Sequence, residues 1–182
     1  MKEIRLHGRG GQGVVMASEI LAVAFVAEGK YATAFPSFGT ERRGAPVKAF
    51  LRTDDKPIRE ITQIYDPDCL LLADPFFQNV AEVFDGLKPE GILVMNSQVP
   101  VERSPHKNAK LLGVVDATSI ALQEIKRPST NTCLVGAFAA TTKWLSLDTI
   151  ELALKEFFNG KALEGNIRCA RRGFEEAKII KF

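Results

Sequence analysis

The residues best suited to bind a charged ligand lie near the start of the chain, in a glycine-rich stretch. Gly8, Gly10 and Gly13 follow a short apolar segment and precede an apolar helix, which gives the G-x-G-x-x-G spacing in its strand–turn–helix setting. Glycine permits positive φ angles and close backbone approach, and the free N–H groups that begin the following helix attract an anion. The stretch predicts a phosphate or other anion site; the alternative is a tight turn without a ligand.

Other residues of this stretch add donors but do not complete a dinucleotide site. Gly11 is a fourth glycine, Arg9 brings a charged donor and Gln12 a neutral one. A dinucleotide site also needs a carboxylate at the end of the second strand, which is expected at residues 31–36 and contains none. The sequence therefore disfavours NAD but not an anionic ligand.

A second polar cluster follows that strand, where Thr40, Arg42 and Arg43 lie between two glycines. In an open α/β sheet this loop leaves the same carboxyl edge as the glycine stretch, and ligands bind in the crevice along that edge. The two guanidinium groups suit phosphate or carboxylate. The alternative is a solvated surface loop. Asn131 begins a later helix, and its side chain could face the same crevice.

Classical catalytic machinery is missing from the sequence. Cys69, Cys133 and Cys169 are scattered and form no C-x-x-C pair, which rules out an iron–sulfur cluster held by this chain alone. The two histidines, His7 and His106, are far apart, so a metal site is not expected. His7 ends the first strand beside the glycines, where a structural role is favoured over ligand contact. We therefore predict no catalytic residue and no metal site, as in a binding subunit of a larger enzyme.

Composition places the chain among ordinary globular proteins. Its 182 residues are 46% hydrophobic and 25% charged, and a net charge of +2 argues against a nucleic-acid surface. Charged residues interrupt the N-terminus, so no signal peptide is expected. The longest apolar stretch, residues 14–27, is too short to cross a bilayer. These features predict a cytoplasmic protein that does not bind a membrane.

Hydrophobic patterning predicts an α/β fold: a single open, mostly parallel Rossmann-like sheet with helices on both faces and a helical C-terminal third, in one domain over residues 1–182. Strands are expected at residues 4–7, 31–36, 47–52, 69–73, 91–95 and 111–115, with a short antiparallel strand at 58–61. Helices are expected at residues 14–28, 75–84, 117–125, 131–144 and 147–158. Asp116 and Ser146 are expected to cap the third and fifth of these, and Gly160 to end the last.

Two predicted helices have apolar surfaces that must be covered. The helix at 14–28 is apolar almost all round, which predicts that it is covered on more than one side. Residues 163–177 form a polar helix with one narrow apolar stripe. That stripe is predicted to pack on its own domain, with a subunit contact as the alternative.

The two polar clusters together resemble a known family. Residues 8–15, GRGGQGVV, followed by residues 35–47, FPSFGTERRGAPV, are similar to the gamma subunit of pyruvate:ferredoxin oxidoreductase (pyruvate synthase), of the 2-oxoacid:ferredoxin oxidoreductase family. The stretch from Asn131 and the terminal amphipathic helix are also similar, so the resemblance covers essentially the whole chain. The sequence departs from the family pattern at Ser37 and Thr40, which leaves the substrate subclass open.

The resemblance implies a role within a complex. The holoenzyme converts pyruvate, coenzyme A and oxidised ferredoxin into acetyl-CoA, CO2 and reduced ferredoxin. Thiamine diphosphate, Mg2+ and [4Fe-4S] clusters belong to the alpha, beta and delta-type partner subunits, and this chain alone binds none of them. The gamma chain contributes a domain that binds coenzyme A or another anion and covers the active site. The isolated chain is expected to be inactive.

The resemblance, together with the residues themselves, gives a set of expected ligand-binding positions. These are Gly8, Arg9, Gly10, Gly11, Gln12, Gly13, Thr40, Arg42, Arg43 and Asn131. Branched-chain 2-oxoacids, 2-oxoglutarate and indolepyruvate remain alternative substrates of the complex. A stand-alone nucleotide-binding regulatory module and a self-sufficient NAD(P) oxidoreductase remain alternatives of other classes.

Overall fold

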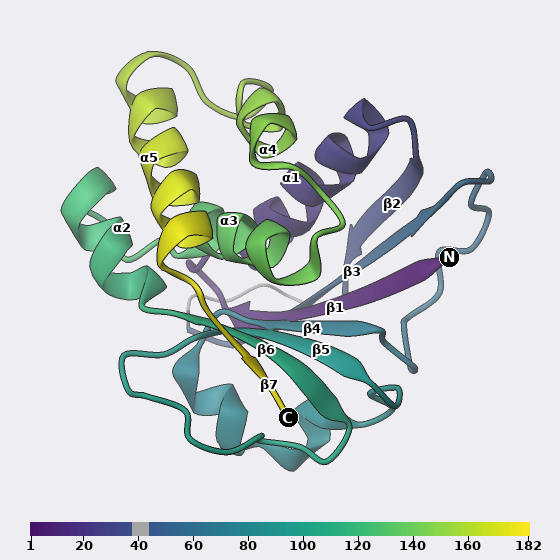
Figure 1. Ribbon diagram of the computed structural model, residues 1–182. Helices are drawn as coiled ribbons and strands as arrows, with labels where there is room; N and C mark the ends of the chain where they lie inside the picture. The colour runs from purple at the N-terminus through teal and green to yellow at the C-terminus, as the bar shows by residue number, and fades with distance from the viewer. Residues whose placement is uncertain (38–43) are drawn as a thin grey trace.

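The centre of the molecule is an open sheet, seen in a computed structural model that describes residues 1–37 and 44–182 (Figure 1). Within these residues seven strands pair in the order β2-β3-β1-β4-β5-β6-β7. Their bounds are β1 Lys2–Arg9, β2 Tyr31–Pro36, β3 Pro46–Asp54, β4 Cys69–Leu72, β5 Gly91–Asn96, β6 Ala109–Val115 and β7 Lys178–Lys181. The pairs β1–β4, β4–β5 and β5–β6 are parallel. By contrast, β3 is antiparallel to β1 and β2, and β7 is antiparallel to β6. The predicted open α/β sheet is therefore confirmed, with its parallel pairs in the middle.

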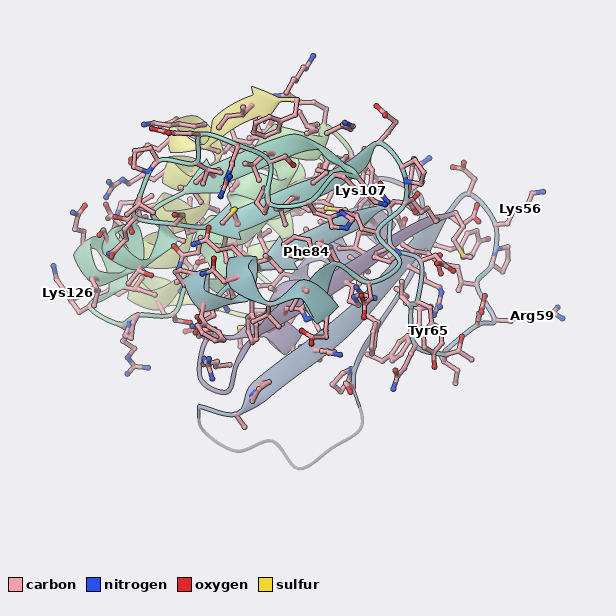
Figure 2. All side chains as sticks on the ribbon, turned by 90° about the horizontal axis from the view of Figure 1, so that it is seen from below. Lys56, Arg59, Tyr65, Phe84, Lys107 and Lys126 are labelled. Carbon is pink, nitrogen blue, oxygen red and sulfur yellow. The ribbon has the colours of Figure 1, made fainter. Side chains whose placement is uncertain are left out.

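Five α-helices gather on one face of the sheet, above it in Figure 1. They are α1 Val14–Ala27, α2 Ala117–Ile125, α3 Asn131–Thr142, α4 Leu147–Leu154 and α5 Gly160–Glu176. Two short 3-10 helices, Pro75–Asn79 and Ala81–Phe84, lie on the opposite face, where Figure 2 shows Phe84 over the strands. No helix in the described part of the chain has the length and apolar character needed to cross a membrane.

The core on the helical face is built around α3, in which every residue is buried. Two glycines allow α3 and α5 to cross with their backbones in contact. A Cβ atom on Gly173 would lie 1.9 Å from the Cys133 carbonyl oxygen, and one on Gly136 would lie 2.0 Å from that of Ala170. Only glycine permits so close an approach.

Two buried arginines organise the opposite face near its amino edge. Arg52, which is 1% exposed, donates to Glu3 Oε1 at 3.0 Å and to the Thr62 carbonyl at 2.6 Å. The Arg5 guanidinium donates to four backbone carbonyls, those of Ile64, Tyr65, Val83 and Asp85. The bonds to Thr62, Ile64 and Tyr65 satisfy carbonyls of the irregular connection between β3 and β4, on which Figure 2 labels Tyr65. The bonds to Val83 and Asp85 hold the segment between β4 and β5. The strand predicted at residues 58–61 is therefore wrong, because arginine side chains replace a partner strand there.

Three further boundaries differ from the prediction. The helix expected at residues 75–84 is split into two 3-10 segments, because Val80 has an extended backbone (φ −102°, ψ 105°). Gly160 begins α5 and does not end the preceding helix, since α4 already ends at Leu154. The terminal strand β7 was not predicted. The side-chain caps predicted at the starts of α2 and α4 are confirmed, at Asp116 and Ser146.

His7 lies on β1, on the face of the sheet that carries the two 3-10 helices, and is 2% exposed. Its Nε2 accepts a hydrogen bond from Arg5 Nε at 3.0 Å, so the imidazole is held in its neutral form. Burial, and then the positive charges of Arg5 and Lys48, lower the pKa of His7 from 6.5 to about 3. These contacts support the structural role predicted for His7.

We expect Gly173→Ala to destabilise the fold by about 1–3 kcal/mol, the usual cost of overpacking. The change adds helix propensity, worth about 1 kcal/mol, but forces a methyl group against the α3 backbone. Gly165→Ala on the same helix is the control, because its nearest neighbour is a side-chain atom and not backbone: Cγ2 of Ile125, 2.8 Å from the added Cβ. Urea unfolding measures the free energy of unfolding of both variants. Equal losses of stability would show that the close α3–α5 contact does not limit the stability of the fold.

We expect the buried His7 to make stability fall in mild acid. The unfolded chain binds a proton near pH 6.5 and the folded chain only near pH 3, so stability is full above pH 6.5 and declines below it. The loss from this group is about 2 kcal/mol between pH 7.5 and pH 5. His7→Gln, which keeps an acceptor for Arg5, should flatten that part of the profile. An unchanged slope in chemical denaturation across this range would contradict the assignment.

Candidate functional site

The glycine stretch forms a tight loop between β1 and α1. Gly11 and Gly13 have φ angles of 96° and 77°, which other residues rarely adopt. A Cβ atom on Gly8 would lie 2.2 Å from Cγ2 of Val14. The glycines therefore serve the close turn that the motif predicts, and they direct the first N–H groups of α1 away from the strand.

Asp74 holds the side chains of this loop from the end of β4. Its Oδ2 accepts from Arg9 Nε at 3.0 Å and from Gln12 Nε2 at 3.2 Å, while Oδ1 accepts from the backbone N–H of Phe76 at 2.9 Å. Gln12 Oε1 in turn accepts from the Arg9 backbone N–H at 2.7 Å. The guanidinium also lies 5.5 Å from the ring centres of Phe76 and Phe77. Arg9 and Gln12 are therefore engaged within the chain and shape the loop.

The residues just before β3 are hydrogen-bonded to the glycine stretch. The Gly10 N–H donates to the Ala45 carbonyl at 2.9 Å, and the Gly44 N–H donates to the Gly10 carbonyl at 3.1 Å. Arg9 Nη1 donates to the Gly44 carbonyl at 3.3 Å. Three predicted site residues lie outside the described residues: Thr40, Arg42 and Arg43.

Asn131 meets the glycine loop, as the sequence predicts. A Cβ atom on Gly13 would lie 2.5 Å from Asn131 Nδ2, so the two residues are in direct contact. Asn131 is 4% exposed, and its side chain is oriented by Met16, whose Sδ accepts from Nδ2 at 3.4 Å, and by Ser129, whose hydroxyl donates to Oδ1 at 3.1 Å. The contact brings the starts of α1 and α3 together.

A cavity of about 610 Å³ opens beside this contact, with Gly13, Met16 and Asn131 on one wall and the start of α5 on another. Four basic residues line it: Lys126, Arg127, Lys161 and Arg168. It contains one carboxylate, Glu124, which accepts from Arg168 Nε at 2.8 Å and is further bonded by Arg172. These hydrogen bonds lower the pKa of Glu124, so it stays ionised. The cavity wall nevertheless carries an excess of positive charge.

The helices that begin at this cavity lack side-chain caps. The N-cap residues of α1, α3 and α5 are Gly13, Thr130 and Asn159, and none of them accepts a capping hydrogen bond through its side chain. By contrast, α2 and α4 are capped by Asp116 and Ser146. The Thr130 hydroxyl is also buried without a hydrogen-bond partner among the described residues. Uncapped N–H groups and the positive ends of three helix dipoles suit an anion.

The thiols are not placed for cluster chemistry. Cys69, Cys133 and Cys169 are free and buried. Burial raises the pKa of all three, that of Cys169 to about 11, so they are protonated at neutral pH. Across residues 1–37 and 44–182, no group of His, Cys, Asp and Glu side chains is arranged to hold a metal ion.

Sequence reasoning missed Asp74 as an organiser of the loop and the basic residues of the cavity. One signal was available for Asp74, because it directly follows a buried strand that ends at the same edge as β1. Another was available for Lys161, which lies in the first turn of α5, where the helix dipole favours acidic residues. A basic residue in that place is unfavourable to the helix dipole and would be stabilised by an anion nearby.

Comparison with known proteins agrees with this geometry. The family described as Pyruvate ferredoxin/flavodoxin oxidoreductase matches residues 3–176. The chain is 47% identical over 184 residues to the pyruvate/ketoisovalerate oxidoreductases common subunit gamma of Pyrococcus furiosus, covering 100% of both chains. It is 46% identical over 181 residues to the gamma subunit of NADH-dependent phenylglyoxylate dehydrogenase from Aromatoleum evansii, covering 98% of this chain and 95% of the other.

A solved structure gives the same assignment. The fold superimposes on the crystal structure of pyruvate oxidoreductase subunit PORC from Thermotoga maritima with a TM-score of 0.86 and 38% identity, covering 99% of this chain and 98% of the other. The resemblance drawn from the two polar clusters is thus confirmed. The chain belongs to the pyruvate ferredoxin/flavodoxin oxidoreductase family, as a gamma subunit.

Proposed function

We propose that this gamma subunit serves a pyruvate:ferredoxin oxidoreductase and binds coenzyme A through its phosphate groups at the cavity between α1, α3 and α5. The complex would convert pyruvate, coenzyme A and oxidised ferredoxin into acetyl-CoA, CO2 and reduced ferredoxin in the cytoplasm. The name of the Thermotoga maritima relative supports pyruvate as the substrate, and the name of the Pyrococcus furiosus relative gives pyruvate together with ketoisovalerate. Alpha, beta and delta-type subunits would be its partners, with ferredoxin as the electron acceptor.

The observation that supports coenzyme A is the convergence of three uncapped helix N-termini with four basic side chains on one cavity. Coenzyme A carries a diphosphate and a ribose phosphate, so it presents several anionic oxygens at once. Backbone N–H groups at helix starts and guanidinium or ammonium groups are the donors that phosphate prefers. A cavity of about 610 Å³ is within the size range of cofactor sites.

The predicted site residues divide into two roles under this proposal. Gly13 and Asn131 line the cavity and would face the ligand directly. The rest of the stretch, Gly8 to Gln12, would act by fixing the start of α1, because Arg9 and Gln12 are held by Asp74. Thr40, Arg42 and Arg43 are retained in the proposal as ligand contacts on the basis of the sequence alone.

Under this proposal the chain's own residues supply binding and orientation. Its buried, protonated thiols do not fit an iron–sulfur cluster, and the described residues include no metal-binding group. We therefore assign the thiamine diphosphate, Mg2+ and clusters of the complex to partner subunits. What remains for this chain is to hold one substrate in place and to cover the active site, which raises the rate through positioning.

Purification of the native complex tests the proposal as a whole. Pyruvate and coenzyme A should give acetyl-CoA with ferredoxin reduction. Branched-chain 2-oxoacids, 2-oxoglutarate or indolepyruvate as the preferred substrate would change the subclass, and mass spectrometry of the acyl-CoA product distinguishes them. Recovery of this chain alone, without partner chains, would support a stand-alone nucleotide-binding module instead.

We expect the double change Arg127→Ala and Lys161→Ala to weaken coenzyme A binding. A hydrogen bond to a charged group is worth about 1.5–3 kcal/mol, so losing one such contact raises the KM for coenzyme A about tenfold or more. Lys155→Ala is the control, because Lys155 is exposed at the end of α4 and does not line the cavity. Steady-state kinetics of the reconstituted complex should show a raised KM with the kcat retained; an unchanged KM would remove the cavity from the proposal.

We expect Asp74→Asn to loosen the glycine loop without removing a ligand contact. The amide keeps one acceptor but turns an N–H2 group toward a donor of Arg9 or Gln12, so the ion pair and one hydrogen bond are lost. The KM for coenzyme A should rise about tenfold in the assembled complex. Asp55→Asn, in an exposed turn, is the control. Wild-type kinetics in Asp74→Asn would show that the loop holds its shape without this carboxylate.

A further inference from the structure

The strand β2 leaves one edge of the sheet open. It is the terminal strand of the sheet order, and no strand lies beyond it within residues 1–37 and 44–182. Its hydrogen-bonding sides are fixed by two neighbouring bonds, from the Ser37 N–H to the Lys48 carbonyl and from the Gly10 N–H to the Ala45 carbonyl. Because antiparallel strands alternate their bonding residues, Tyr31, Thr33 and Phe35 bond to β3. The N–H and C=O groups of Ala32 and Ala34 therefore point outward.

The two edges of the sheet differ in how they are protected against pairing. The opposite edge is β7, which has four residues and carries Lys178 and Lys181. Charged side chains and short length are the usual means by which edge strands avoid association. By contrast, β2 has six residues and no charged side chain. Pro36 lies at its end with its nitrogen on the outward side, which limits further pairing in that direction without weakening the β3 ladder.

The helix beside this edge is more apolar than its surroundings require. The sequence predicts that α1 is covered on more than one side, yet Val26 is 56% exposed and Val15 and Ala22 are only half-buried. Figure 1 shows α1 packed over β2 at this end of the sheet, and Tyr31 at the start of β2 is 49% exposed. An unpaired strand and an apolar helix flank thus occur together.

We propose that β2 pairs with β2 of a second copy of this chain, antiparallel and about a two-fold axis through Thr33. In this register Ala32 exchanges two hydrogen bonds with Ala34 of the second copy, and the symmetry repeats them, so every outward donor of these alanines meets an acceptor. Thr33 lies opposite Thr33 of the second copy. Tyr31 faces Phe35 of the second copy on the same side of the sheet, an aromatic pair of the kind that stabilises neighbouring strands.

The strand fits a second copy because it is complementary to itself. A two-fold interface requires each patch to match its own image, and this register does so in backbone bonds and in both side-chain pairs. The two α1 helices would come to lie on the same side of the joined sheet. The proposed gamma–gamma contact is independent of the coenzyme A site, which opens at the starts of α1, α3 and α5.

A disulfide across the axis tests the proposal. Thr33→Cys places two thiols directly opposite one another at a non-hydrogen-bonded pair, where side chains are closest. Mild oxidation of this variant, both as the full chain alone and within the assembled complex, should give a linked pair of gamma chains on a non-reducing gel. The native cysteines do not interfere because all three are buried. Ile179→Cys on the other edge is the control and should stay unlinked.

The oligomeric state gives a second measurement. Ala34→Pro removes an outward N–H and leaves the β3 bonds intact, so sedimentation should show the mass of the full chain fall to half. Ile179→Pro is matched, because the Phe182 bond to Lys110 places the Ile179 N–H outward on β7, and it should remain a dimer. Thermal melts establish that both variants fold. A monomeric wild-type chain, a dimeric Ala34→Pro variant, or an assembled complex in which Thr33→Cys does not link would each overturn the proposal.

Discussion

The site depends above all on the contact between Gly13 and Asn131. Gly13 has a left-handed backbone, and a Cβ atom there would lie 2.5 Å from the Asn131 amide. This contact sets the starts of α1 and α3 side by side, so that both helix dipoles direct positive charge into one cavity. A side-chain cap is worth about 1 kcal/mol to a helix, and the three helices at the cavity do without one. Their free N–H groups remain available for a ligand.

Asp74 changes how the glycine motif should be understood. The pattern suggests that Arg9 and Gln12 are donors to an anion, but both donate to the Asp74 carboxylate. The motif therefore contributes shape, and much of the cavity's positive charge comes from Arg127 and Lys161, more than a hundred residues away in sequence. The charge of Arg9 is neutralised where the loop must be rigid, and unpaired donors are concentrated where the cavity is open.

Local patterns predicted most of the fold and, at the candidate site, the glycine turn and its neighbour Asn131. The apolar runs predicted the main strands, and Asp116 and Ser146 predicted two helix starts. The glycine spacing predicted the turn, which lies beside Asn131. What failed depends on contacts distant in sequence. Arg52 holds the connection after β3 by bonding carbonyls that a strand would have used, and nothing in the local sequence shows this. The cavity likewise forms from three separate segments that only the tertiary structure brings together.

Under the proposed function, a subunit that positions a substrate has strict geometric demands. Coenzyme A is long and flexible, and its thiol reacts far from its phosphates, so fixing the phosphates restricts where the thiol can reach. Binding energy from such remote groups is used to orient the reacting end. That energy is useful only if the cavity itself does not move, which explains why backbone contacts such as Gly173 against Cys133 hold α5 to α3 and the Asp74 ion pair holds the loop before α1. Under the proposed function, rigid packing around the cavity would be the chain's contribution to catalysis.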